Sequence, residues 1–115
     1  MAEVRAIAKH VRIPPRKARP VASLIRSQNA ETALETLRFV NSKAARLVAR
    51  VLRSAMANAE TTAKLDRAAL VVKDARVDEG IGWPARRMRS RGAVDLIHRR
   101  TSHITVVVEE AERGD

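Results

Sequence analysis

The sequence contains no cysteine and very few aromatic residues. Its 115 residues include no Cys or Tyr, one Trp and one Phe. The lack of Cys excludes disulfides, thiolate zinc sites and a thiol nucleophile. An aromatic content of 2% is too low for a sheet that stacks the bases of single-stranded RNA. The longest apolar stretches, 68–72 and 104–108, are far shorter than the roughly 20 residues that a membrane helix needs.

Signals of targeting and of catalysis are also missing. The N-terminus has no apolar block typical of a signal peptide, so we expect a cytoplasmic protein. The chain has neither a Gly-rich phosphate loop nor a Gly-x-Ser-x-Gly elbow. His98 and His103 lie five positions apart on one expected strand, so they would point to opposite faces, which is poor geometry for a shared metal. We therefore expect no enzyme, no catalytic residue, no metal and no cofactor.

Positive charge is what the sequence has in excess. Lys and Arg number 23 against 13 Asp and Glu, which gives a formal net charge of +10. A charge of this sign and size favours a polyanionic partner. The hydrophobic content of 45% is too high for a disordered basic tail. The length fits one domain over residues 1–115, with a short C-terminal tail at 111–115.

Periodicity and helix-breaking residues divide the chain into alternating strands and helices. Pro20 lies inside the first expected helix, which predicts either a kink or a later helix start. The break at Asn41 and Ser42 provides a cap for the longest expected helix. We expect strands at 4–13, 70–77 and 93–109, and helices at 15–26, 30–39 and 43–61.

The longest expected helix, 43–61, has an apolar face and a basic face. Helical geometry places the two sets of residues on roughly opposite sides. No acidic residue occurs between Glu35 and Glu60, so the basic face lacks the Glu partners of an ordinary solvated surface. This pattern favours phosphate contact. The apolar face consists of Ala44, Val48, Val51 and Ala55, and the basic face of Lys43, Arg46, Arg50 and Arg53.

Two further basic clusters lie at 4–30 and 81–92, and neither range contains an acidic residue. Uncompensated charges of this kind are explained by phosphate contact better than by a solvated surface, where both signs are normally mixed. An arm at about 77–95 would extend beyond the body and would be ordered by a partner. Trp83 could stack on a base or pack on its own hairpin. The clusters hold Arg5, Lys9, Arg12, Arg16, Lys17, Arg19 and Arg26, and Arg86, Arg87, Arg89 and Arg91.

Four short segments carry a resemblance to a known family. They are Pro-Arg-Lys-Ala-Arg at 15–19, Ala-Met-Ala-Asn-Ala at 55–59, Val-Asp-Glu-Gly at 77–80 and Arg-Thr-Ser-His-Ile-Thr-Val-Val-Val at 100–108. In order and spacing the chain resembles the bacterial form of the large-subunit ribosomal protein twenty-two family. The resemblance implies an α+β fold in which a small three-stranded antiparallel sheet packs with three helices and a long β-hairpin protrudes at about 77–95. The tip departs from the family, because Trp83-Pro84-Ala85 replaces its usual Met-Lys-Arg.

The resemblance also implies a role. A member of this family is a structural constituent of the large ribosomal subunit that binds 23S rRNA, helps its assembly and places the hairpin in the wall of the nascent-peptide exit tunnel. Its partners are 23S rRNA, neighbouring large-subunit proteins and, at the hairpin tip, the nascent peptide and macrolide antibiotics. We expect rRNA contacts from Arg5, Lys9, Arg12, Arg16, Lys17, Arg19, Lys43, Arg46, Arg50, Arg53, Arg86, Arg87, Arg89, Arg91, Arg99 and Arg100, and tunnel-lining positions at Trp83, Pro84, Ala85, Arg86, Arg87 and Met88.

Two other functions remain as alternatives. A DNA-binding regulator would place helix 43–61 in the major groove, but it needs amide or mixed polar side chains toward the base edges. The basic face of this helix is purely cationic. The third candidate is a small metal-dependent nuclease. Adding divalent metal and assaying for cleavage of nucleic acid would test it.

Overall fold

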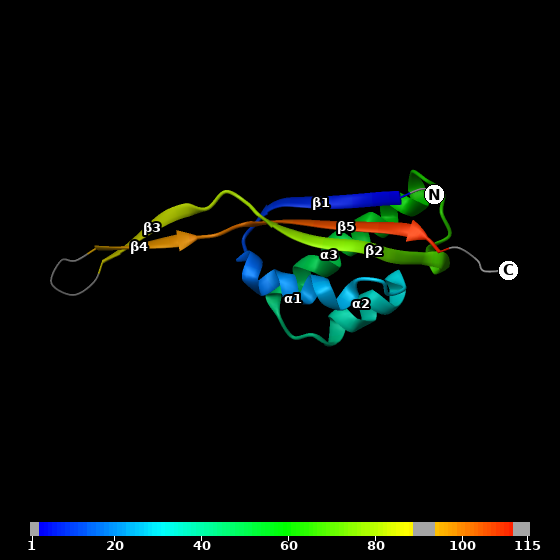
Figure 1. Ribbon diagram of the computed structural model, residues 1–115, viewed down its shortest axis with the longest axis horizontal. Coiled ribbons are helices and arrows are strands. Elements are labelled where there is room, and N and C mark those ends of the chain that lie inside the picture. The colour runs from blue at the N-terminus through cyan, green and yellow to red at the C-terminus, as the bar shows by residue number, and fades with distance from the viewer. Residues whose placement is uncertain (1–2, 89–93, 112–115) are drawn as a thin grey trace.

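The computed structural model describes residues 3–88 and 94–111, with side chains outside 83–99. Figure 1 shows a body made of a sheet and three helices, from which a two-stranded arm extends. This arrangement confirms the α+β fold that the resemblance implies. The elements are β1 (Glu3–Val11), α1 (Pro15–Ile25), α2 (Ala30–Phe39), α3 (Lys43–Thr61), the short 3-10 helix η1 (Arg67–Ala69), β2 (Leu70–Glu79), β3 (Trp83–Met88), β4 (Val94–Arg99) and β5 (Ser102–Glu110).

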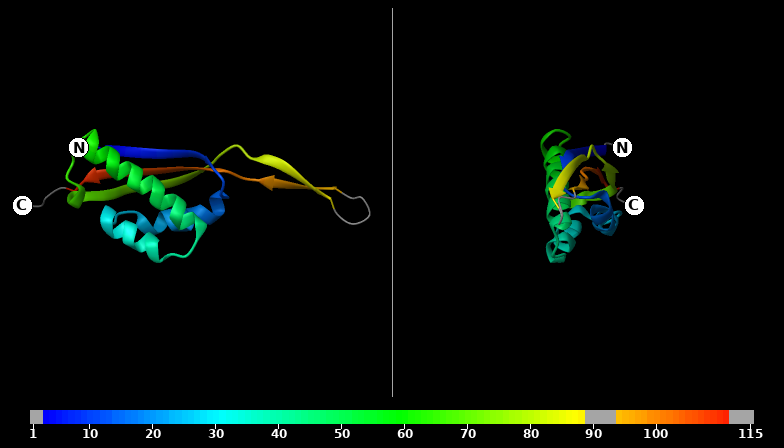
Figure 2. Two further views of the ribbon diagram at one scale, coloured as in Figure 1. Left: turned by 180° about the vertical axis from the view of Figure 1, so that it is seen from behind. Right: turned by 90° about the vertical axis from the view of Figure 1, so that its left-hand side faces the viewer.

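The body is a two-layer structure with the three helices on one face of the sheet (Figure 2). The strand order is β1-β5-β2, and both pairs are antiparallel. In β1, Ala6 is buried while Arg5 and Ile7 are exposed, as expected of a strand with one covered face. The central strand β5 lies between two partners and is the most buried of the three.

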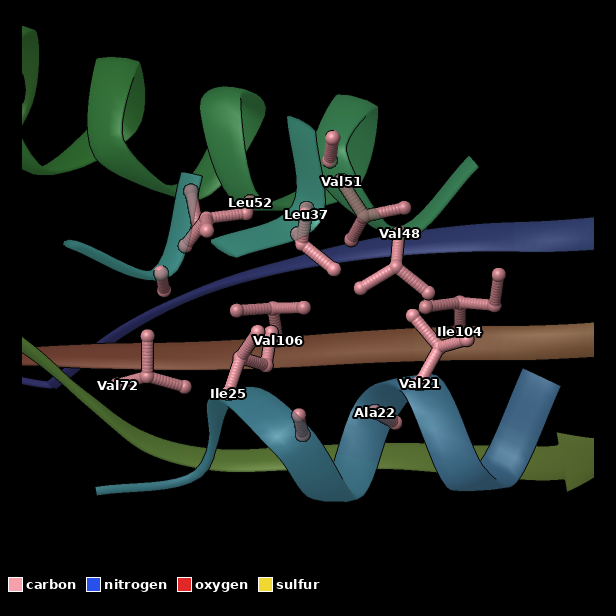
Figure 3. Close-up of a cluster of buried hydrophobic side chains, with 14 of the residues drawn as sticks. Val21, Ala22, Ile25, Leu37, Val48, Val51, Leu52, Val72, Ile104 and Val106 are labelled. Atoms are coloured by element: carbon pink, nitrogen blue, oxygen red, sulfur yellow. The ribbon is translucent and has the colours of Figure 1, made fainter. Parts of the chain in front are cut away.

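The core lies between β5 and the inner faces of α1 and α3 (Figure 3). Ile25 of α1, Leu52 of α3 and Val106 of β5 are fully buried in the same cluster. The apolar face expected of α3 is confirmed, because Ala44, Val48, Val51 and Ala55 are all buried. The core cluster of the described residues contains no aromatic side chain, so Ala, Val, Leu, Ile and Met fill it.

Side-chain caps set the starts of the second and third helices. The Asn29 Oδ1 atom accepts a hydrogen bond from the Glu31 N–H at 3.0 Å. The Ser42 hydroxyl accepts from the Ala45 N–H at 3.1 Å, which confirms the cap that the sequence predicts. Such caps satisfy N–H groups that have no partner within the helix.

Pro20 does not delay the first helix. α1 begins at Pro15, where a missing N–H costs nothing, and continues through Pro20 to Ile25. The expectation of a later start is therefore wrong. Pro20 lies on the exposed side of α1, where water can bond to the carbonyl group that the ring leaves without a partner.

The arm begins and ends later in the sequence than the expected 77–95. Val77–Glu79 belong to β2 and pair with β5, because Val77 faces Ile104 and Glu79 faces Ser102. The paired arm instead joins β3 to β4, from Trp83 opposite Arg99 to Met88 opposite Val94. The strand expected at 93–109 is thus two strands, β4 and β5. The long dimension of 71 Å, against 26 and 18 Å, reflects this protruding arm.

A small polar cluster at Gly80 and Thr101 separates the arm from the body. The Gly80 N–H donates to the Thr101 carbonyl at 2.9 Å, and the Thr101 hydroxyl donates to the Ile81 carbonyl at 2.7 Å. The buried Ser102 hydroxyl donates to the Ile13 carbonyl at 2.6 Å. A Cβ atom at Gly80 would overlap the Thr101 hydroxyl, so only glycine fits there. These contacts explain why Thr101 and Ser102 occupy the point where β5 begins.

Candidate nucleic-acid interface

A basic groove lies between α2 and α3. Its volume is about 530 Å³, and its apolar lining includes Leu34, Leu37 and Val40. We call it the arginine groove. Its charged residues are Arg38 from α2 and Arg46, Arg50 and Arg53 from α3.

The four arginines of this groove face one another because of helical spacing and helix packing. Arg46, Arg50 and Arg53 are separated by four and three positions, which places them on one face of α3. The packing of α2 along α3 brings Arg38 to the same hollow. All four are exposed, and none forms an ion pair with another described residue. Their mutual repulsion is relieved by a multivalent anion, such as the phosphates of a nucleic acid.

Lys43, the first residue of the expected basic face, lies in a different hollow. Its Nζ atom donates to the Arg12 carbonyl at 2.9 Å. Lys43 lines a hollow of about 490 Å³ together with Arg12 and Lys17. The structure therefore divides the basic face of α3 and joins its first residue to the N-terminal cluster.

A third hollow lies where α1 begins beside the base of the arm. Its volume is about 410 Å³, and Arg16, Lys17, Arg19 and Arg100 line it with the single acid Glu79. Residues far apart in sequence are thus brought together. Part of the charge also has a packing role, because the Arg19 Nε atom donates to the Val77 carbonyl at 3.3 Å.

The rest of the N-terminal cluster does not gather at one place. Arg5 and Lys9 are exposed along β1, away from the hollows just described. Arg26 is drawn to β2, where its Nε atom donates to the Ala75 carbonyl at 2.9 Å and lies 3.8 Å from an Asp74 oxygen. The expectation of an uncompensated charge at Arg26 is therefore wrong. Arg26 holds α1 against the sheet.

The described ion pairs concentrate away from the arm. Arg67 in η1 pairs with Glu31 and Glu60, with N–O distances of 3.3 and 3.7 Å. Lys73 pairs with Glu3 at the start of β1 and with Glu109 near the end of β5. The start of β1 and the end of β5 lie at the end of the body opposite the arm (Figure 1). The acids thus neutralise one end of the body and leave the arginine groove uncompensated.

The arm carries the remaining predicted positions. Trp83, Pro84, Ala85, Arg86, Arg87 and Met88 form β3, and Arg99 ends β4. Arg87 is opposite Asp95 in the register, and Trp83 is opposite Arg99. Arg89, Arg91 and residues 112–115 of the tail lie outside the described residues. The Trp83 side chain is not among those described, so its stacking on a base and its packing on the hairpin both stay predictions.

The histidines His10, His98 and His103 lie on three different strands. His98 and His103 lie on β4 and β5, which corrects the expectation that they share one strand. The His103 Nδ1 atom accepts a hydrogen bond from the backbone N–H of His10 at 3.1 Å. The two rings pack edge to face, with centroids 4.7 Å apart. No group of three His, Cys, Asp or Glu residues in the described part of the chain could hold a metal ion. Over the same residues, no helix is long and apolar enough to cross a membrane.

The groove itself and its fourth arginine were not predicted. Arg38 follows the buried Leu37 on the outer face of a short helix, and nothing in its spacing relates it to Arg46. The signal available was one of charge alone, because Arg38 lies within the segment 36–59 that contains no acidic residue. The packing of α2 on α3 places Arg38 beside the arginines of α3, and spacing within one helix cannot show this.

A basic α+β body that carries a protruding arm is typical of a protein that binds a polyanion. Comparison with known proteins defines the class further. The family model of ribosomal protein L22p/L17e matches residues 6–109, and the chain belongs to this family. Membership confirms both the resemblance noted in the sequence and the expectation of a structural, non-enzymatic protein of the large ribosomal subunit.

Curated relatives match almost end to end. The large ribosomal subunit protein uL22 of Desulforamulus reducens is 47% identical over 112 residues, which cover 97% of this chain and 99% of the relative. The protein of the same name from Desulfitobacterium hafniense strain Y51 is 47% identical over 114 residues, 99% of this chain and all of the relative. That of Syntrophomonas wolfei is 47% identical over 110 residues, 96% and 97% of the two chains.

Proposed function

We propose that the chain binds 23S rRNA and helps its assembly, as one rRNA-binding domain of a cytoplasmic ribosome. The observation that carries this proposal is the arginine groove, in which four exposed arginines have no ion-pair partner among the described residues. Guanidinium groups match phosphate oxygens with paired hydrogen bonds. Basic residues of the two smaller hollows, and Arg5 and Lys9 on β1, extend the same chemistry over the body.

The groove favours RNA shape over DNA sequence as the feature that is recognised. A recognition helix must protrude to enter the major groove of DNA. Here α2 packs alongside α3, so the arginines of α3 line a hollow between two helices. Arginines placed there can contact phosphates of RNA segments that converge on the body, with little readout of bases.

Changing Arg50 to Ala tests the rRNA contact. If Arg50 neutralises one phosphate, the slope of log affinity against log salt becomes less steep by about 0.7 to 0.9. Binding to 23S rRNA is measured by filter retention over a range of salt concentrations. Arg67→Ala is the matched control, because Arg67 is already ion-paired with Glu31 and Glu60. Affinity that does not depend on salt, or equal competition by duplex DNA, would contradict the proposal.

We further propose that the arm lies in the wall of the nascent-peptide exit tunnel. A hairpin of two strands is marginally stable in water unless something packs on it. β3 and β4 pair only with each other, and the arm protrudes from the body (Figure 2). RNA on its sides would hold such an arm, and the positions from Trp83 to Met88 would then face the nascent peptide and bound macrolides. Arg86, Arg87, Arg99 and the two undescribed arginines, Arg89 and Arg91, would contact rRNA.

A photo-reactive residue in place of Arg87 tests the position of the arm. On ribosomes that carry a radiolabelled nascent chain, we expect irradiation to link the protein to that chain. The same residue in place of Glu31, in the body, should give no such product. If neither position or both positions react, the arm does not line the tunnel selectively.

A further inference from the structure

Phe39, the last residue of α2, is exposed to an unusual degree. Its exposed fraction is 87%, against 72% for Ile81 and 47% for both Ile7 and Leu24. Leu37, two positions earlier, is only 3% exposed. Two helical positions correspond to a turn of about 200°, so the Phe39 ring points away from the core.

The Phe39 ring is not part of the packed core of the body. Aromatic side chains contribute strongly to a core when they are buried. The described core nevertheless contains none, and the only Phe of the chain stands in water. A single exposed apolar residue is common on protein surfaces. What distinguishes Phe39 is its location.

Phe39 does not line the arginine groove itself but is flanked in sequence by residues that do. Arg38 precedes it, Val40 and Asn41 follow it, and all three line the groove. A protein partner would need more apolar surface around the ring. The apolar lining of the nearby groove is half-buried at Leu34 and Val40 and buried at Leu37. The other exposed large apolar residues, Ile7, Leu24 and Ile81, belong to other elements. A nucleotide instead offers both groups that this location can bind: a phosphate for guanidinium and a flat base for the ring.

We propose that Phe39 is a stacking platform for one unpaired RNA base, while the phosphates of the same strand lie in the arginine groove. This inference rests on the proposed rRNA binding and adds a contact to it. One platform differs from a stacking sheet, which the low aromatic content excludes. Stacking tolerates any base, because every base has a π-face, so the site would select unpaired RNA rather than a sequence.

Loss of the ring should weaken rRNA binding without changing its salt dependence. Phe39→Ala is expected to reduce the affinity for 23S rRNA by about 5- to 150-fold, the range that alanine substitution gives for one stacked base. Phe39→Trp should keep the affinity, whereas Phe39→Leu should lose it despite its apolar volume. Leu24→Ala, which removes a half-exposed apolar residue from α1, should bind like the wild type. Full affinity in Phe39→Leu would indicate an apolar contact and overturn the stacking.

A fluorine label on phenylalanine gives a direct reading, because the chain has only one Phe. A single-stranded oligoadenylate should move the fluorine resonance upfield, since a stacked base shields the ring. Duplex RNA of the same length should bind the arginines and leave the resonance unmoved. A bound oligoadenylate that causes no upfield shift would overturn the proposal.

The two hypotheses fail in different ways. If the wild type does not bind 23S rRNA, the proposed function is wrong and the stacking falls with it. If the wild type binds, and Arg50→Ala reduces the salt slope while Phe39→Ala binds normally, only the stacking is wrong.

Discussion

Replacing Arg46, Arg50 and Arg53 together by Gln is expected to weaken binding to 23S rRNA about 50- to 150-fold at a salt concentration of about 0.15 M. Three lost phosphate contacts reduce the steepness of the salt dependence by about 2 to 2.7. In this linear relation the electrostatic contribution to binding vanishes near about 1 M salt. The expected loss of affinity at about 0.15 M salt is therefore the change in slope multiplied by the difference in log salt concentration between these two points. Glutamine keeps a long polar side chain, so the helix face is otherwise little changed.

The matched control removes the same amount of charge elsewhere. Arg67, Lys73 and Arg76 are each ion-paired with acids in the body. Changing all three to Gln also lowers the net charge of +10 by three. We expect affinity to stay within a few-fold of the wild type, because these residues already have anionic partners. If both triple variants lose affinity equally, overall charge rather than the arginine groove determines binding.

Gly80→Ala is expected to lower the free energy of unfolding by about 2–4 kcal/mol. The new Cβ atom would overlap the Thr101 hydroxyl, which is buried and donates to the Ile81 carbonyl. The loss therefore combines overpacking with a disturbed buried hydrogen bond. Urea unfolding followed by circular dichroism measures it.

Gly82→Ala is the control for the backbone effect of removing a glycine. Gly82 is exposed and lies two positions further along the chain. We expect a smaller change there, within about 1 kcal/mol. Equal midpoints for the wild type and the Gly80 variant would show that the contact at the base of the arm does not constrain the chain.

Local patterns were sufficient for most of the body. The helix 43–61 has the predicted bounds, because Ser42 caps it and alternating apolar and basic positions define its two faces. The strand from Leu70 was likewise evident from its β-branched residues. Such features depend on neighbours within a few residues, which a sequence displays directly.

The remaining features depend on contacts between distant segments. The division of 93–109 into β4 and β5 follows from the fit of Gly80 against Thr101, which no periodicity shows. The sequence groups Arg26 with a free basic cluster and does not show its ion pair, because the partner Asp74 lies on β2, far along the chain. The arginine groove requires two helices to pack side by side. The arginines could be predicted as a stripe, but not the hollow they form.

The placement of the ion pairs makes the charge uneven over the body. Acids neutralise the bases near the start of β1 and the end of β5, while the exposed arginines of the groove remain unpaired within the described residues. In the field of a polyanion, this asymmetry exerts a torque that turns the neutral end outward. Approach would therefore be oriented before any contact forms, and added salt would slow the encounter by screening the torque as well as the attraction.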